Sequence, residues 1–279
     1  MSSKVLKPED YVEPECVICD KPIGTNQKIQ RIPQQRISQK LDELMGQQEY
    51  GAAEAMLNYW ISEAQACGDK QGEFMVYNEK MGFYRKLAKK EKAYEAADMA
   101  IGMLEALDYS DTVSGATCYT NAATVYTAFN DVGRSLELFE KARIIYENNK
   151  TNNEFKLAGL YNNMAIALVS LNRFEEADRL YNNALELLDT CANGELEKAI
   201  TYLNMVDAML KEKGINEETE NLAVPLMYNA QLCLDSENLP RDSYYAFVAD
   251  KCYPIYEYFQ WYDYAEELKD RIKEINERS

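Results

Sequence analysis

Apolar and small side chains recur along the chain with the spacing of one face of an α-helix. In the segment 177–188 they lie 3, 4, 7, 10 and 11 residues after the first such position. These offsets place them on a single helical stripe. A second stripe of the same kind runs over residues 157–171, and Asn172-Arg173 separates the two. The segment therefore predicts two amphipathic helices joined by a short turn, which is an antiparallel pair.

This helix pair recurs about every 42 residues. Moving the 177–188 stripe back by 42 gives 135–146, and further steps of 42 and 40 give 93–104 and 53–64. One helix pair cannot cover its own apolar face, so successive pairs stack on one another. The sequence thus predicts an all-α fold, an α-α superhelix, over residues 36–276 behind an N-terminal arm of residues 1–35. The predicted units lie near residues 36–68, 72–109, 112–149, 154–190, 195–236 and 241–276.

The residues of one unit resemble the tetratricopeptide family. In Leu160–Ala177, Tyr161 stands at the first aromatic position of the family pattern and Ala165 at the small one, and residues 77–93 carry the same pattern. The period near 42 is longer than the usual 34. It is similar to the kinesin-light-chain style of repeat. The resemblance implies a right-handed solenoid of about six antiparallel helix pairs and a groove that holds proteins or peptides, and it favours a bacterial source.

Asparagines recur on the first helices of the repeats. In the family the corresponding positions face the groove, where an amide can both donate to and accept from a peptide backbone. First helices about 9 Å apart would spread four such positions over roughly 27 Å, which matches about eight residues of an extended chain. The alternative is that the amides bond between adjacent helices or face water. The candidate groove residues are Asn78, Asn121, Asn162, Asn163 and Asn204.

The last two units depart from the pattern. Pro225 falls inside the second helix of the fifth unit and is expected to start or bend that helix, and Pro254 is expected to interrupt the first helix of the sixth. Aromatic residues are dense near the C-terminus. Some of them are predicted to form a partner or dimer surface, with a buried aromatic end cap as the alternative. The candidate surface residues are Tyr258, Trp261 and Tyr264.

Cys16 and Cys19 form a lone Cys-x-x-Cys in the N-terminal arm. A tetrahedral zinc site needs four ligands, and the arm offers only these two. A redox role would need the motif at the start of a helix after a strand. Zinc at Cys16 and Cys19, shared across a dimer, is therefore a secondary hypothesis, and otherwise no cofactor is expected.

Composition narrows the function further. The 279 residues carry a net charge of −17, which disfavours nucleic acid and anionic membranes and favours a basic or neutral protein or peptide partner. The absence of histidine removes the commonest general base, so an enzyme is not expected. No segment approaches the roughly 20 apolar residues of a membrane span, and the seven cysteines are an odd number, so we predict a cytoplasmic protein with reduced thiols.

The leading hypothesis is a scaffold or adaptor that holds an extended segment in its groove. The alternatives are a cytoplasmic peptide-sensing regulatory module and, with less support, a metal or thiol site at the cysteine pair. The sequence leaves the oligomeric state open, with a dimer among the options.

Overall fold

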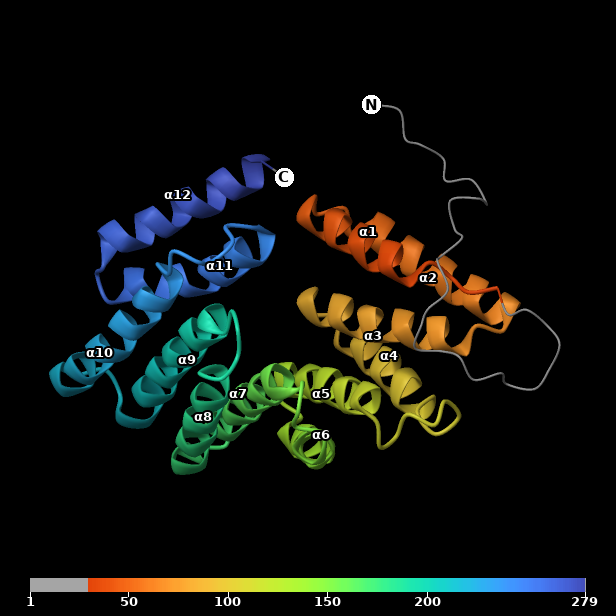
Figure 1. The fold of residues 1–279 in the computed structure, drawn as a ribbon, viewed down its shortest axis with the longest axis horizontal. Coiled ribbons are helices and arrows are strands. Elements are labelled where there is room, and N and C mark those ends of the chain that lie inside the picture. Colours follow the sequence, from red (N-terminus) through yellow and green to blue (C-terminus); the bar gives the residue numbers. More distant parts are fainter. Residues whose placement is uncertain (1–29, 279) are drawn as a thin grey trace. The chain divides into compact units, whose positions relative to one another are not determined.

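The structure is a computed structural model that describes residues 30–278, and these residues form twelve α-helices without a β-strand (Figure 1). None of the described helices has the length and apolarity that crossing a bilayer requires. The helices are α1 (Gln34–Gly46), α2 (Tyr50–Cys67), α3 (Lys70–Lys86), α4 (Lys90–Gly102), α5 (Val113–Ala128), α6 (Val132–Asn148), α7 (Glu154–Ser170), α8 (Phe174–Leu188), α9 (Glu195–Lys213), α10 (Glu217–Leu234), α11 (Ser243–Tyr258) and α12 (Tyr262–Arg278).

These helices follow one another as six pairs, which confirms the predicted all-α fold of stacked helix pairs. The chain divides into two compact units, the first ending at Asn130 and the second beginning at Asp131. Inside the first unit α3 packs against α1, α2, α4 and α5, and inside the second unit α9 packs against α7, α8, α10 and α11. Helices α3 and α9 therefore each contact both their own partner helix and the first helices of the neighbouring pairs in the same unit.

A left-handed residue follows the first helix in five of the six described pairs, α9 being the exception. The backbone φ is 58° at Gln48, 53° at Ala88, 60° at Asn172 and 62° at Gln260. The next amide then bonds back across the end of the helix, as Lys89 N does to the Tyr84 carbonyl at 2.9 Å. This 6→1 bond is the Schellman ending, and it reverses the chain within three residues.

A small residue near the start of the second helix is buried in most of the pairs. Ala53, Ala93, Ser135 and Ala177 have no exposed surface, and Ala265 has almost none. Such residues let two helix backbones approach closely, because a larger side chain would need space that a close-packed interior lacks. The rest of the predicted stripe from Ala177 to Leu188 is also buried, except for half-buried Leu180.

The two prolines do not delimit helices. Helix α10 begins at Glu217, well before Pro225, and α11 continues past Pro254 to Tyr258, so the predicted interruption is wrong. A proline removes one backbone hydrogen bond of the helix. Burial outweighs this loss in α11, where Cys252 and Tyr256 are core residues and the Tyr256 hydroxyl donates to the Met227 carbonyl at 2.9 Å.

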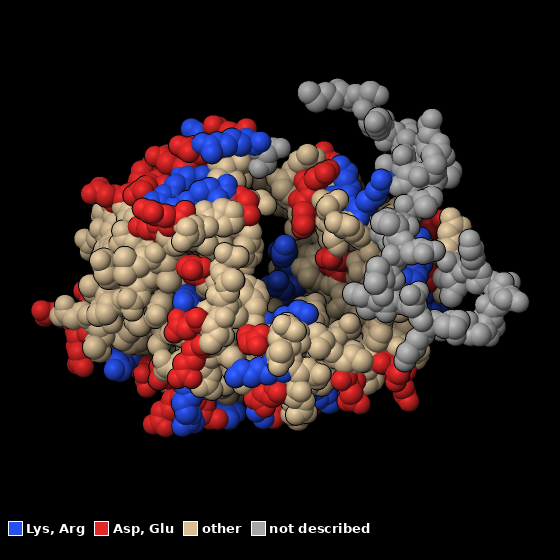
Figure 2. All heavy atoms as spheres, viewed as in Figure 1, with Lys and Arg blue, Asp and Glu red and all other residues tan. Residues whose placement is uncertain are grey.

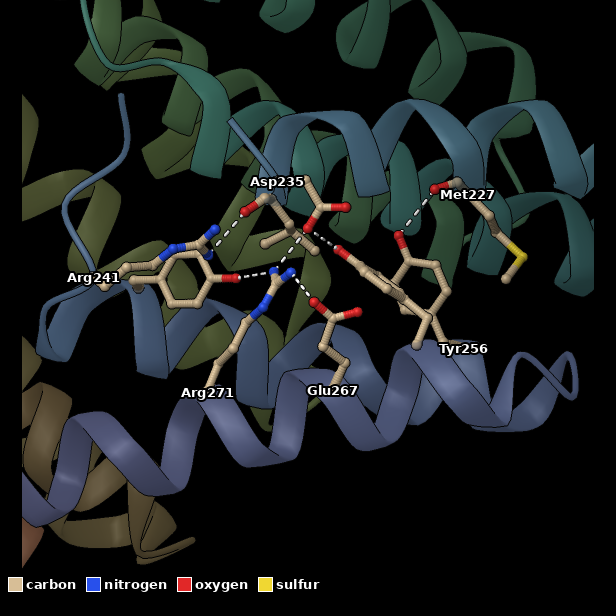
Figure 3. Close-up of polar contacts among 9 residues, drawn as sticks. Met227, Asp235, Arg241, Tyr256, Glu267 and Arg271 are labelled. Atoms are coloured by element: carbon tan, nitrogen blue, oxygen red, sulfur yellow. Dashed lines mark hydrogen bonds and ion pairs between the residues drawn. The ribbon is translucent and has the colours of Figure 1, made fainter. Parts of the chain in front are cut away.

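A polar cluster fastens the last helix pair to α10 (Figure 3). Arg271 of α12 donates from Nη1 to Asp235 Oδ1 at 2.7 Å and to the Tyr245 hydroxyl at 2.8 Å, and it also bonds Glu267. The Tyr264 hydroxyl donates to the same Asp235 oxygen at 3.0 Å. Hydrogen bonds that include a charged group are the stronger ones, so the C-terminal end of the described chain is closed by direct contacts.

Ala88 offers a test of the repeated turn. An L-residue with a Cβ in the left-handed region costs roughly 1 kcal/mol relative to glycine. We expect Ala88→Gly to raise the free energy of unfolding by about that amount, measured by urea denaturation. Ala55→Gly, at an exposed position inside α2, is the control and should lower it by about 1 kcal/mol. The same sign of change in both variants would show that the Ala88 conformation carries no strain.

Candidate functional site

Three first helices of the second unit, α7, α9 and α11, enclose a hollow of about 250 Å³, here called the α7–α9–α11 pocket. Its floor is partly apolar, with Ile166, Ile200 and Ile255 contributed by the three helices in turn. Its polar lining residues are Asn162, Asn163, Glu197, Asn204, Asp207 and Lys251. Three of the five predicted asparagines therefore meet in one hollow.

The repeat spacing brings two of these amides into contact. Asn162 and Asn204 are 42 residues apart, one repeat, and Asn204 Nδ2 donates to Asn162 Oδ1 at 3.1 Å. Asn162 is only 8% exposed, whereas Asn204 is half-buried. A primary amide has two donors and an acceptor, so each side chain keeps capacity for another partner.

Asn163 lies beside this pair and is half-buried. Its amide has no hydrogen bond to another residue in the part of the chain that the structure describes, and it lines the same pocket. Of the three asparagines, Asn163 is thus the one whose polar atoms are free of an internal bond.

In the first unit Asn78 and Asn121 form a separate, looser contact. Asn121 Nδ2 lies 3.5 Å from Asn78 Oδ1, and Asn78 Nδ2 donates to the Phe74 carbonyl at 3.0 Å. These are bonds between and within helices, the alternative that the sequence left open. These bonds use only part of the hydrogen-bonding capacity of each amide. A role for Asn78 and Asn121 in a peptide groove therefore stays a prediction.

Two carboxyl groups in the α7–α9–α11 pocket have raised pKa values. Burial raises the pKa of the Glu197 carboxyl, and the nearby Lys251 ammonium opposes this shift. Burial likewise raises the pKa of Asp207. The Tyr244 hydroxyl donates to Glu197, and Lys251 Nζ stands 4.1 Å from the centroid of the Phe247 ring. The site thus combines amides with both signs of charge, and two aromatic rings contact its charged residues.

Sequence reasoning missed the charged and aromatic residues of this site. Glu197, Ile200, Asn204 and Asp207 recur at helical spacing along α9, so they share one face with the recognised asparagine. Extending each asparagine position along its own helix would have identified the acidic residues. The contribution of Lys251 and the α11 aromatics depends on how the last pair stacks, which the degenerate repeat obscures.

The predicted C-terminal surface is only partly exposed. Tyr264 is 7% exposed and hydrogen-bonded to Asp235, so its assignment to a partner surface is wrong. Trp261 is half-buried with its ring 5.8 Å from that of Tyr256. Only Tyr258 is well exposed, at 50%. Tyr264 and Trp261 instead fit the alternative, an aromatic end cap, because their rings pack in the C-terminal core.

The predicted zinc ligands Cys16 and Cys19 lie outside the described residues. Within residues 30–278 no three potential metal ligands gather at one point. Burial raises the pKa of the Cys118 and Cys252 thiols to about 12, which keeps both protonated near neutral pH. Neither thiol is therefore suited to act as a nucleophile or a metal ligand.

Comparison with known proteins agrees with this architecture. The family model for the tetratricopeptide repeat matches residues 116–148 and 157–188, so the chain contains tetratricopeptide repeats in these stretches. This confirms the resemblance inferred from the sequence. No match is found among curated proteins. The bacterial source remains a prediction.

Solved structures with TM-scores above 0.5 share the fold of this chain at low sequence identity. BtubC (BKLC) from P. vanneervenii is 15% identical over 75% of this chain and 83% of that chain, with a TM-score of 0.62. A putative kinesin light chain with TPR-like repeats from Podosopora anserina is 15% identical over 72% and 94%, with a TM-score of 0.48. The quorum sensor NprR from B. thuringiensis, solved with its cognate peptide NprX, is 13% identical over 86% and 66%, with a TM-score of 0.52. The chain spans about 66% of the length of NprR.

Glu197 allows a test of the pocket electrostatics. A carboxyl whose pKa is raised in the folded state destabilises the fold once it ionises. This cost in free energy disappears when the pH falls below the pKa of the same carboxyl in the unfolded chain, about 4.3. We therefore expect Glu197→Gln to raise the melting temperature at neutral pH, with the difference vanishing in acid. Glu186→Gln, on the exposed face of α8, is the control and should change little. A less stable Glu197→Gln at neutral pH would mean that pairing with Lys251 outweighs burial.

Proposed function

We propose that this protein is a binding scaffold that holds an extended protein segment across α7, α9 and α11. The TPR-like fold is typical of proteins that bind proteins or peptides. The observation that carries the proposal is the α7–α9–α11 pocket, where α7 and α9 present amides at repeat spacing and α11 adds the charged Lys251. Binding needs no cofactor, and the protonated thiols give no support to catalysis.

The size of the site sets the length of ligand. Three first helices at about 9 Å spacing cover roughly 18 Å, which corresponds to about five or six residues of extended chain. In this proposal Asn163 bonds the ligand backbone. Asn162 and Asn204 hydrogen-bond one another, and each amide has capacity for a further partner. Hydrogen bonds from these amides to the ligand backbone do not depend on the ligand's side chains, so ligands of different sequence can bind.

The charge of the chain favours a basic or neutral ligand. Glu197 and Asp207 outnumber Lys251 in the pocket lining, and the whole chain carries a net charge of −17. A basic side chain bound near Glu197 would also offset the cost of burying that carboxylate. The structure of NprR with its peptide supports a peptide as the class of ligand.

The same site would serve an adaptor or a cytoplasmic peptide-sensing module, since these differ in their output and not in the binding step. For this chain, the cytoplasmic location and any zinc at Cys16 and Cys19 are hypotheses separate from the pocket.

A display library of random peptides of about eight residues, screened on the full-length protein, would test the proposal. Recovered peptides, resynthesised with blocked ends, should bind the wild type. We expect Asn163→Ala to weaken binding by roughly 5- to 10-fold, because one hydrogen bond to the ligand is worth about 1 kcal/mol. The melting temperature should not change, because the Asn163 amide has no internal bond to lose.

The matched control is Asn183→Ala, which removes an equally polar side chain from the exposed face of α8. It should bind the recovered peptides as the wild type does. Peptides that bind the wild type and Asn163→Ala equally well, or a library that yields no binder, would contradict the proposed site.

A further inference from the structure

The outer face of α10 is apolar, unlike that of the other second helices. Four large apolar side chains on it are each between 43% and 54% exposed. They are Leu222, Val224, Tyr228 and Leu232. Each of the other second helices in the described chain exposes at most two such side chains. With Ala223, Met227 and Ala230 in the core, α10 therefore carries apolar side chains on both its buried and its exposed side, although Glu217, Glu218 and Glu220 make its first turn acidic.

The neighbouring helix α8 shows what an ordinary outer face looks like in this protein. Its exposed residues include Glu175, Asp178, Arg179 and Glu186. By contrast, the sequence of α10 from Asn221 to Leu234 has no charged residue, although 28% of the chain is charged. In Figure 2 the region over α10 and α11 of the second unit is largely uncharged, while α12 carries many charged side chains.

An apolar groove borders this face. The groove lies between α8 and α10 with α9 as its floor and has a volume of about 490 Å³. Its apolar lining residues include Phe174, Met205, Met209 and Leu226, together with Leu222 and Pro225 of α10. Four charged residues also line it: Glu175, Asp178, Glu212 and Lys213. Methionine-rich apolar grooves adapt readily to an inserted side chain. The face of α10 thus has both a projecting part and a recess beside it.

We propose that the outer face of α10 is the dimer interface, where it packs against the same face of a second copy of this chain. Charge argues for this occupant. Two copies that each carry −17 repel one another wherever acidic surfaces meet, and the uncharged stretch of α10 is a place where they can approach without that penalty. A two-fold axis would make the contact self-complementary, with the projecting Tyr228 of each copy available to the groove of the other.

The area is compatible with a dimer. The four exposed side chains and the groove present on the order of 500 Å² of apolar surface, a size at which a patch is often an interaction site. With a polar rim this approaches the roughly 800 Å² per partner of a stable interface. This inference does not rest on the proposed peptide site, because it uses a second helix and the α7–α9–α11 pocket is built from first helices.

Sedimentation equilibrium of the full-length protein over a wide dilution series tests the proposal. We expect a mass of twice 32.1 kDa at high concentration. Leu232→Glu and Tyr228→Glu should each raise the dimer dissociation constant by roughly 100-fold or more, because a central apolar contact is lost and two carboxylates are brought together. Both sites are exposed, so circular dichroism melting should show that the variants stay folded.

Ile144→Glu is the matched control, since Ile144 is 50% exposed on α6 and isolated from the α10 face. It should leave the dimer unchanged. Added salt should strengthen the wild-type dimer, because it screens the repulsion between acidic chains without weakening an apolar contact. A wild type that is monomeric throughout the series, or a dimer that survives both glutamate substitutions, would overturn the proposal.

Discussion

The close approach of the two helices within a pair is the constraint on which the rest of the structure depends. A left-handed residue reverses the chain, and a small buried residue such as Ala93 or Ala177 then lets the second helix lie directly on the first. Because the same arrangement recurs at nearly constant spacing, the first helices of each unit come to lie side by side. Residues one repeat apart, such as Asn162 and Asn204, consequently reach hydrogen-bonding distance without any local signal for it.

Repetition explains why the fold could be predicted from the sequence. A single amphipathic stripe is weak support for a helix, but stripes at 53–64, 93–104, 135–146 and 177–188 support one another. The wrong predictions concern the last two units, where the repeat pattern is degenerate. Pro254 was expected to break a helix, and only the packing of Tyr256 on α10 shows why the helix continues. Tyr264 could not be distinguished from its exposed neighbour Tyr258 without knowing its contact with Asp235.

The candidate pocket, too, could be predicted only in part from the sequence. Its asparagines recur with the repeat period, so the sequence predicts them. Glu197 and Lys251 become part of the pocket only because α9 and α11 meet there, which the sequence does not reveal. Their chemistry is costly for the fold, since burial disfavours the ionised Glu197 carboxylate. Polar groups held in a hollow at such a cost are common at binding sites, where a ligand supplies what the folded chain leaves unmet.

The polar cluster around Arg271 has a consequence for how this chain can change in length. The guanidinium joins Asp235, which follows α10, to Tyr245 of α11, so three consecutive helices share one set of bonds (Figure 3). Deleting α12 alone would remove the guanidinium and the Tyr264 hydroxyl together, leaving both Asp235 and the Tyr245 hydroxyl without these partners. The end of the described chain therefore depends on α12, because the loss of this half of the last pair would leave two polar groups unpaired.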